Sequence, residues 1–340
     1  MSVTSASPDS LLPAIARPDV SVIVPTWLRP GLLERCLAAL ARQTLAPARY
    51  EIVVCDDGPD DATRSLVERF AAESRARGLE IRYLPIAATQ GPAAARNAGW
   101  RHARAPVIAF TDDDTIADAG WLEAGLAAMS ESVAAAAGTI VVPLPERPTD
   151  YEADASGLAR ADFATANVFV RRNALMIVGG FDERFTAAWR EDSDLQFSLM
   201  RACGRIVRAH DAIVVHPVRP ARFGVSLAQQ KKSRFEALLY AKHRRLYKRH
   251  IARRPPLNYY AIVLSAISAV FGAACHAILI AILGGFLWLG LTARFFSRRM
   301  RGRSRQWRHV AEMAVTSPLI PFLSIYWRIR GAVSYRTWFL

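Results

Sequence analysis

Three consecutive aspartates stand in the segment AFTDDDTIADAGW, directly after a short apolar run. Asp112, Asp113 and Asp114 would repel one another at close range, so the cluster is either a solvated turn or a place where a cation binds. Carboxylate oxygens are the ligands that Mg²⁺ and similar hard divalent cations prefer. A metal held there could neutralise a diphosphate and stabilise it as a leaving group. The cluster therefore indicates metal chemistry, with a solvated turn as the alternative.

Two further acidic pairs could take part in chemistry. Asp56 and Asp57 follow the apolar run in YEIVVCDDG, and Glu191 and Asp192 open the stretch that continues as SDL. A carboxylate that faces an acceptor hydroxyl can accept its proton as a general base. Acids in the first turn of a helix also suit the helix dipole, which would explain the second pair without a catalytic role.

An alternation of strands and helices would position these acids. Apolar, β-rich runs at 20–25, 50–58, 79–85 and 105–114 are separated by helical stretches and short loops. This order predicts an α/β fold of three layers, with a mostly parallel sheet covered by helices on both faces. Another strand is expected at 134–143, and the segment 189–217 is expected to form a helix followed by two short strands. Ligands of such sheets bind outside the carboxyl ends of the strands, where residues 56–57 and 112–114 fall.

The chain is strongly basic, and its charge is unevenly placed. The 340 residues include 44 Lys and Arg against 30 Asp and Glu, a formal net charge of +14, and the bases concentrate from 201 to 308. This balance is compatible with nucleic acid, anionic lipid or anionic small molecules as partners. Four scattered cysteines indicate neither a disulfide framework nor a zinc site. Residues 1–18 are polar and are expected to form a flexible leader, not a secretory signal.

The C-terminal third has the composition of a membrane anchor. Residues 257–293 contain no Asp, Glu, Lys or Arg, a stretch too long for one straight span. We expect a two-span hairpin over 257–296 whose ends lie in the cytosol because both flanks are basic. A buried pair of core helices is the alternative. The apolar stretch 313–327 contains Pro318 and Pro321 and is expected to be interfacial, re-entrant or a third span.

The segment before the hairpin is basic and amphipathic. Within 225–251, Leu227, Phe235, Leu238, Leu239 and Leu246 are interleaved with many bases. A helix of this kind suits an anionic membrane surface. Nucleic-acid binding is less favoured because the adjoining spans place the segment at a bilayer, so we expect no specific nucleic-acid partner. The expected division is a leader at 1–18, an α/β domain at 19–220, an interfacial region at 221–256, the hairpin at 257–296 and a tail at 297–340.

Six segments carry a resemblance to a known family. In order they are VSVIVPTWLRPGLLERCLAAL, EIVVCDDGPDDAT, GPAAARNAG, FTDDD, ANVFVRRNALMIVGGFDERF and WREDSDL. Any one is weak, but six in the right order and spacing are specific. Over residues 18–220 the chain resembles a family 2 glycosyltransferase with the GT-A fold. The resemblance implies transfer of a sugar from a nucleotide-sugar donor, inversion at the anomeric centre, and Mg²⁺ or Mn²⁺ as cofactor.

The same resemblance implies roles for particular residues. Asp192 corresponds to the general base, with Glu191 beside it as the rival. Asp112 and Asp114 form the DxD motif, with Asp114 as the direct metal ligand, and His216 is either a further ligand or a structural histidine. The residues expected at the nucleotide are Pro25, Thr26, Asp56, Asp57, Arg96, Asp112 and Asp113. Those expected at the acceptor are Gly180 and Asp182, for which a surface acid is the alternative.

One departure from the family concerns processivity. Processive members carry a Q-x-x-R-W motif after the base, whereas QQKKSRF at 229–235 and RQWR at 305–308 have the wrong spacing or order. Transfer of one or few sugars is therefore favoured. The acceptor is expected to be a lipid-linked group or glycan at the cytoplasmic membrane, with the catalytic domain on the cytosolic side. Two alternatives stay open: a non-catalytic nucleotide-binding membrane scaffold, and a sugar-phosphate nucleotidyltransferase, which the lack of a Gly-rich phosphate loop disfavours.

Overall fold

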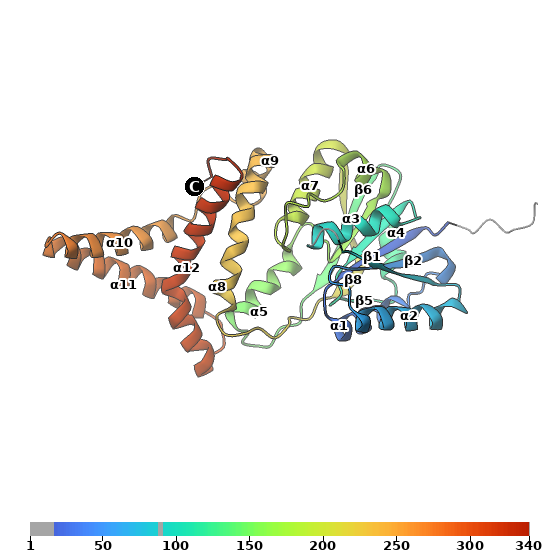
Figure 1. Cartoon of the computed structure of the whole chain (residues 1–340), viewed down its shortest axis with the longest axis horizontal. Helices are drawn as coiled ribbons and strands as arrows, with labels where there is room; N and C mark the ends of the chain where they lie inside the picture. The colour runs from blue at the N-terminus through green and yellow to red at the C-terminus, as the bar shows by residue number, and fades with distance from the viewer. Residues whose placement is uncertain (1–16, 88–90, 340) are drawn as a thin grey trace, which may run out of the picture.

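The structure, a computed structural model, describes residues 17–87 and 91–339. An α/β domain built around one sheet is joined to a set of long helices from the C-terminal third (Figure 1). Two of these helices extend away from the rest of the molecule as a hairpin.

The described part of the α/β domain contains a mixed sheet of eight strands, in the order β3-β2-β1-β4-β7-β6-β8-β5. β1 to β4 pair in parallel, as the sequence predicts, and so do β6 and β8. β7 runs antiparallel between β4 and β6, and β5 is antiparallel to β8. The strands are β1 (Val20–Thr26), β2 (Tyr50–Asp56), β3 (Glu80–Pro85), β4 (Val107–Thr111), β5 (Ile116–Ala117), β6 (Val133–Val141), β7 (Asn167–Arg171) and β8 (Arg205–Val215).

The sheet differs from the sequence prediction in two places. It is mixed, not mostly parallel, because β7 follows β6 through α5 (Asp150–Ala155), a short helix with no buried residue, and not through a long crossover helix. β8 is one strand of eleven residues where two short strands are predicted. Its pairing with β6 shifts register between Gly138 and Thr139, and this irregularity explains why the sequence pattern suggests a break.

Helices cover both faces of the sheet, which confirms the predicted three layers. α1 (Pro30–Leu40), α2 (Asp61–Arg75) and α4 (Trp121–Ala127) pack on one face, with Val22 and Val24 of β1. α3 (Pro92–His102), α6 (Arg172–Val178) and α7 (Glu191–Ala202) pack on the other face, with Ile23 of β1. Successive side chains of a strand point to opposite faces, so one buried strand supplies both cores.

The helix before the hairpin turns its apolar side toward the protein. After α8 (Val225–Gln229), α9 (Arg234–His250) buries Phe235, Leu238 and Leu239 in a cluster with Phe197 of α7 and Phe339 near the C-terminus. Three of the five apolar side chains that predict a lipid-facing segment are therefore not available to lipid, and the other two, Leu227 and Leu246, are half-buried. A location of α9 at a membrane surface stays a prediction, and it now depends on its exposed bases.

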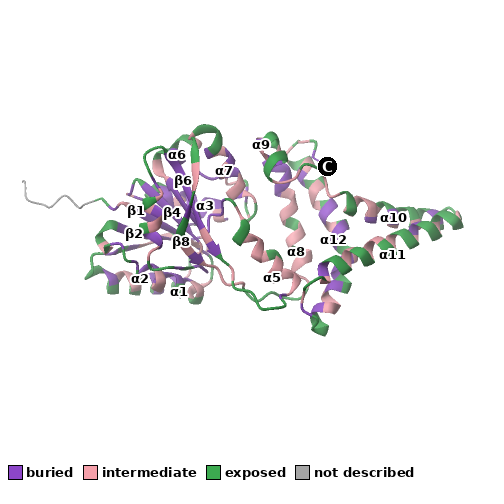
Figure 2. Ribbon diagram, turned by 180° about the vertical axis from the view of Figure 1, so that it is seen from behind, coloured by how far each residue is buried: buried purple, intermediate pink, exposed green. Residues whose placement is uncertain are grey.

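Long apolar helices follow α9. α10 (Leu257–Ala274) and α11 (Ile278–Met300) occupy the stretch predicted as a hairpin, and α12 (Trp307–Ser334) is continuous through both of its prolines. Within the described ranges, these three helices are long and apolar enough to cross a membrane. Much of the surface of α10 and α11 is exposed and apolar (Figure 2). These features suggest that the protein associates with a membrane.

Candidate active site

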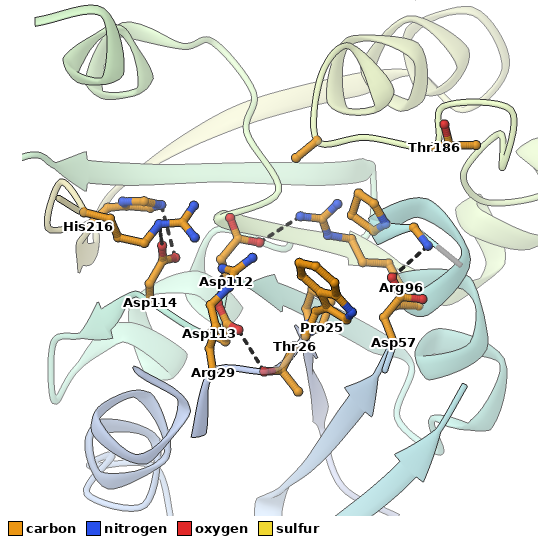
Figure 3. Close-up of a pocket in the computed structure, with 16 residues that line it drawn as sticks. Pro25, Thr26, Arg29, Asp57, Arg96, Asp112, Asp113, Asp114, Thr186 and His216 are labelled. Carbon is orange, nitrogen blue, oxygen red and sulfur yellow. Dashed lines mark hydrogen bonds and ion pairs between the residues drawn. The ribbon is translucent and has the colours of Figure 1, made fainter. Parts of the chain in front are cut away.

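A cavity of about 550 Å³ opens where β1, β2 and β4 end (Figure 3). This is the sheet edge at which the sequence predicts a ligand site. The start of α3 and the loop before α7 complete its wall, through Gly91 and Thr186 among others. Gly91 is required there, because its φ is +119° and an added Cβ would lie 3.3 Å from the Thr186 backbone. Eight residues predicted to bind nucleotide or metal line this cavity: Pro25, Thr26, Asp57, Arg96, Asp112, Asp113, Asp114 and His216.

Each of the three aspartates has polar or cationic partners of its own, which offset part of their mutual repulsion. Asp112 accepts a hydrogen bond of 2.8 Å from Nη2 of Arg96. Asp113 accepts from the hydroxyl of Thr26 at 2.8 Å and from Arg29 at 3.1 Å. Burial raises the pKa of Asp113 to about 6 despite these partners. Burial also acts to raise the pKa of Asp112, but the hydrogen bond and positive charge of Arg96, together with the nearby His216 and Arg219, outweigh it and leave that pKa below the usual value.

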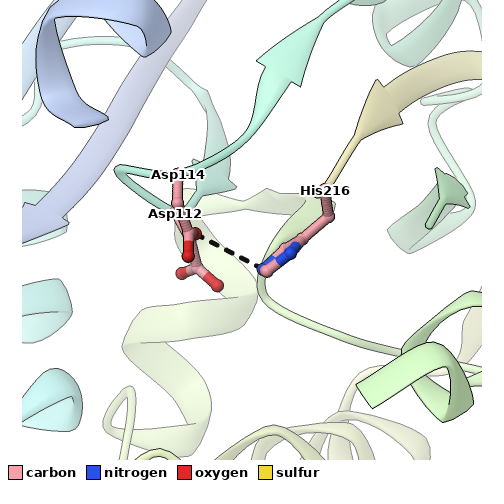
Figure 4. Close-up of side chains that lie close together, drawn as sticks. All are labelled: Asp112, Asp114 and His216. Carbon is pink, nitrogen blue, oxygen red and sulfur yellow. Dashed lines mark ion pairs between the residues drawn. The ribbon is translucent and has the colours of Figure 1, made fainter. Parts of the chain in front are cut away.

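Asp112, Asp114 and His216 form the candidate metal site (Figure 4). Their ligand atoms lie within 4.8 Å of one another. The topology brings them together, since β5 follows the aspartates and pairs with the end of β8, directly before His216. Asp114 lies 3.4 Å from His216 and 3.0 Å from Nε of Arg219. Sequence reasoning missed Arg29 and Arg219, which lie in loops without a recognisable pattern.

The two neighbouring acids Asp56 and Asp57 have different environments at the end of the cavity near β2. Asp57 lines the cavity and accepts a hydrogen bond of 2.8 Å from the Gly91 amide. Its other oxygen is buried and has no hydrogen-bond partner among the described residues. Asp56 is fully buried and accepts from the hydroxyl of Tyr83 and the amide of Gly58. Asp56 therefore supports the strand end, and Asp57 is the acid that a ligand can reach.

Glu191 and Asp192 begin α7 outside the cavity lining but are linked to it. Nη1 of Arg96 lies 3.3 Å from Glu191, so this buried guanidinium bridges Glu191 and Asp112. The Thr165 hydroxyl donates a 2.6 Å hydrogen bond to Asp192. Burial raises the pKa of both acids. The pKa of Glu191 rises to about 8, and the negative charge of Asp192 contributes to this rise.

Partly buried ion pairs connect α7 and its preceding loop to α9. Glu236 of α9 accepts hydrogen bonds from Trp189 and from Arg190, which precedes α7 with a left-handed φ of +75°. Lys242 of α9 donates to Asp194 of α7 at 2.8 Å. The position of the two acids at the start of α7 therefore depends on α9.

The two residues predicted to contact the acceptor have structural partners. Gly180 has a φ of +77°, and an added Cβ would collide with side-chain atoms of Asn97 and Trp100, so the position needs glycine for packing. Asp182 accepts hydrogen bonds from Arg184 and Lys242. These bonds outweigh the effect of burial and hold the pKa of Asp182 far below its usual value. Neither residue lines the cavity in the described structure, and their contact with an acceptor stays a prediction.

Comparison with known proteins identifies the family. Residues 21–185 match the family described as glycosyl transferase family 2, and residues 107–296 match glycosyl transferase family group 2. Glycosyltransferase AglE of Haloferax volcanii is 31% identical over 228 residues, which are 63% of this chain and 71% of that protein. The chain belongs to glycosyltransferase family 2.

Two further likenesses are informative about this family 2 glycosyltransferase. A glucosyltransferase of Escherichia coli, whose name specifies UDP-glucose and a GlcNAc-diphosphoundecaprenol acceptor, is 34% identical over 110 residues, 32% of this chain and 40% of its own. The mannosyltransferase PcManGT of Pyrobaculum calidifontis, solved with GDP-mannose and Mn²⁺, superposes with a TM-score of 0.53 at 20% identity. That match covers 94% of this chain and 88% of the mannosyltransferase, and it shows that the GT-A fold is shared.

Glu191→Gln is expected to stabilise this glycosyltransferase at alkaline pH more than at acidic pH. Between the usual pKa of about 4.5 and the raised value of about 8, the folded state keeps a proton that the unfolded state has released. The free energy of unfolding of the wild type therefore falls as pH rises through this window. Glutamine has no proton to lose and still offers Arg96 an acceptor. Thermal unfolding at about pH 5 and about pH 9 measures the difference in Tm, and an unchanged difference would contradict the raised pKa.

Proposed function

We propose that the enzyme transfers a sugar from a nucleotide-diphosphate sugar, with inversion, to a hydroxyl or phosphate of a membrane-lipid-linked acceptor, using a divalent metal and Asp192 as general base. The observation that carries the proposal is the bridge through Arg96, which joins Asp112 of the candidate metal site to Glu191 at the start of α7. This bridge fixes the distance between the donor site and the acids that could accept a proton.

A divalent metal fits the residues at the candidate metal site. Two carboxylates and one imidazole form an oxygen and nitrogen set that suits Mn²⁺ and also accommodates Mg²⁺. Within the described chain, Oδ2 of Asp114 is buried and faces a positive charge, because it lies 3.0 Å from Nε of Arg219. A metal ion bound there would share this oxygen with Arg219 or take its place. When bound, the metal supplies positive charge that stabilises the departing diphosphate. The Mn²⁺ in the mannosyltransferase neighbour supports this assignment.

The nucleoside fits the end of the cavity near Asp57. A base N–H can donate to the buried Oδ1 of Asp57, while Pro25 and the exposed ring of Trp27 offer apolar surface beside it. Thr26 contributes indirectly, since its hydroxyl is held by Asp113. Arg96 likewise acts on the donor through Asp112.

Asp192 is better suited than Glu191 to accept the proton of the acceptor. Glu191 is only 2% exposed, and its Oε2 is buried without a partner in the described structure. Asp192 is half-buried, and the hydroxyl of Thr165 orients it through one oxygen, Oδ1. Its raised pKa makes this carboxylate a stronger proton acceptor than an exposed aspartate would be.

The support for a lipid-linked acceptor on the cytosolic side comes from a relative and from the apolar helices, not from the residues of the cavity. The Escherichia coli relative is named for a diphosphoundecaprenol-linked acceptor. The apolar hairpin of α10 and α11 is flanked by basic segments, which favours a cytosolic position for both of its ends and for the catalytic domain. Gly180 and Asp182 are proposed to border the acceptor path, next to the loop that leads to α7.

A donor and acceptor screen tests the proposal against both alternatives. The purified protein in detergent is incubated with UDP-, GDP- and dTDP-sugars, Mn²⁺ or Mg²⁺, and extracted membrane lipids, and nucleoside diphosphate release is measured. We expect release with one donor class that requires both metal and lipid. Pyrophosphate release from a nucleoside triphosphate and a sugar phosphate would indicate a nucleotidyltransferase. Nucleotide binding without turnover in any combination would favour a scaffold.

A further inference from the structure

Helix α12 carries a continuous apolar stripe on its exposed side. The side chains are 38–73% exposed and follow one another in steps of four and three residues: Val315, Leu319, Phe322, Tyr326, Ile329 and Val333. Such steps keep side chains within an arc about 80° wide and extend the stripe over about 27 Å. Within 314–333, the exposed residues of α12 are apolar or tyrosine except for Arg330 near the C-terminal end of the stripe. A stripe of this length is larger than the scattered apolar residues of an ordinary protein surface.

The opposite side of α12 is fixed to the rest of the protein. The backbones of Gly331 and Arg234 lie so close together that a Cβ at position 331 would collide with the start of α9. Thr316 and Ser317 accept hydrogen bonds of 2.8 and 3.0 Å from Arg299, which also pairs with Asp150 at 2.7 Å. Arg299 belongs to the C-terminal end of α11, so α12 is held in one unit with α9, with this end of α11 and, through Arg299, with the α5 segment of the catalytic domain.

The direction of α12 differs from that of the hairpin. α10 and α11 extend along the long axis of the molecule, whereas α12 runs across it (Figure 1). If α10 and α11 cross a bilayer, α12 then lies along the membrane surface. Trp307 and Trp338, which are 77% and 87% exposed, stand at or just beyond its two ends. Exposed tryptophans of this kind are enriched at membrane–water interfaces.

A spanning position for α12 conflicts with its attachment to α9. α9 exposes Arg244, Arg245, Lys248 and Arg249. Moving α12 into the hydrocarbon core would draw these bases in with it, or would break the contact between Gly331 and Arg234. Charged side chains are costly at that depth. At the surface, the same bases can contact anionic headgroups.

We propose that α12 is an interfacial helix that inserts its apolar stripe between the headgroups and acyl chains of the cytosolic leaflet, and that the chain crosses the membrane only twice. The inference rests on the membrane hairpin of the proposed function. We expect lipid, not a second protein, to cover the stripe. The reason is that α12 contacts α10 and α11, whose exposed apolar surface would itself lie in the membrane. An interfacial helix buries its apolar face roughly 5–10 Å deep. The catalytic cavity is thereby held at a fixed height above the lipid surface.

Fluorophore depth distinguishes a helix along the surface from one across the bilayer. Single cysteines are introduced by Val315→Cys, Phe322→Cys and Ile329→Cys in a full chain that carries Cys203→Ser and Cys275→Ser. Each is labelled with an environment-sensitive probe in phosphatidylcholine–phosphatidylglycerol vesicles with nitroxide lipids, labelled near the headgroup or near the end of the acyl chain. Leu264→Cys in the middle of α10 is the deep reference, and Met176→Cys on α6 is the aqueous reference.

We expect the three stripe probes to report one shallow depth, with at least twofold stronger quenching by the headgroup-proximal nitroxide, and Leu264→Cys to show the reverse preference. A deep Phe322→Cys probe between two shallow ones would indicate a third span and overturn the proposal. Stripe probes that no lipid quenches, beside a quenched Leu264→Cys, would show that protein, such as a second copy, covers the stripe. An unquenched Leu264→Cys would instead reject the hairpin and the membrane part of the proposed function.

Discussion

Replacing Asp192 with asparagine is expected to lower the rate of sugar transfer by about 10²–10⁴-fold and to leave nucleotide-sugar binding close to that of the wild type. Asparagine preserves the shape of the side chain and can still accept a hydrogen bond from Thr165. It cannot take a proton from the attacking hydroxyl. The loss should therefore appear in kcat, measured as nucleoside diphosphate release with saturating donor and lipid, and not in donor affinity measured by calorimetry.

Glu191→Gln is the matched control for this experiment. It removes the neighbouring carboxylate on the same helix turn but keeps an acceptor for Arg96. If Asp192 is the base, Glu191→Gln should retain far more activity than Asp192→Asn. The opposite order would assign the base to Glu191. Equal and complete losses in both variants, with donor binding intact, would mean that the two acids act as one coupled unit.

The same assignment implies a rising pH profile. A general base works only when it is deprotonated, and burial raises the pKa of Asp192 above that of an ordinary aspartate. The rate of the wild type should therefore increase with pH over a range in which an exposed aspartate is already fully ionised. Burial raises the pKa of Glu191 to about 8, so Glu191 keeps its proton at neutral pH. Glu191 and Asp192 together therefore carry little negative charge at that pH.

The sequence was sufficient to predict the first half of the sheet but not the direction of its later strands. β1, β2 and β4 are buried on both faces and therefore read as continuous apolar runs. The orientation of β7 depends on the route of the chain through α5, which leaves no periodic pattern. α9 shows a related limit. Its pattern reveals an apolar face but not whether lipid or protein covers that face, and here α7 and the C-terminal segment do.

The site could be located from the sequence, whereas its partners could not. Strand ends place Asp57 and the three aspartates at one edge, because parallel strands share the edge at which they end. His216 enters through the family resemblance, and the pairing of β5 with β8 gives the physical reason for its position. Three partners neutralise or orient acids of the site, namely Arg29, Arg219 and Thr165. These partners lie in loops where neither spacing nor composition indicates a role. Arg96 was predicted at the nucleotide, while its bridge between two acids depends on tertiary structure alone.

Asp114→Asn is expected to lower transfer by about 100-fold or more, because a metal at this site supplies several kcal/mol of charge stabilisation and each ~1.4 kcal/mol corresponds to a factor of ten. The amide removes one of the two carboxylates in the cluster with His216. The concentration of Mn²⁺ that gives half-maximal activity should rise at the same time. Metal titrations of nucleoside diphosphate release, together with calorimetry of Mn²⁺ binding, measure both effects.

Asp113→Asn separates loss of a metal ligand from loss of charge in the cluster. This middle aspartate has its carboxylate turned to Thr26 and Arg29 and away from the candidate metal site. The substitution removes the same charge from the same loop and keeps an oxygen that can accept from Thr26 or Arg29, so it should leave the Mn²⁺ dependence close to that of the wild type. If Asp113→Asn shifted the Mn²⁺ dependence as far as Asp114→Asn does, the cluster would act by its overall negative charge. The assignment of Asp112, Asp114 and His216 as the metal ligands would then be wrong, because a defined ligand set must distinguish neighbouring carboxylates.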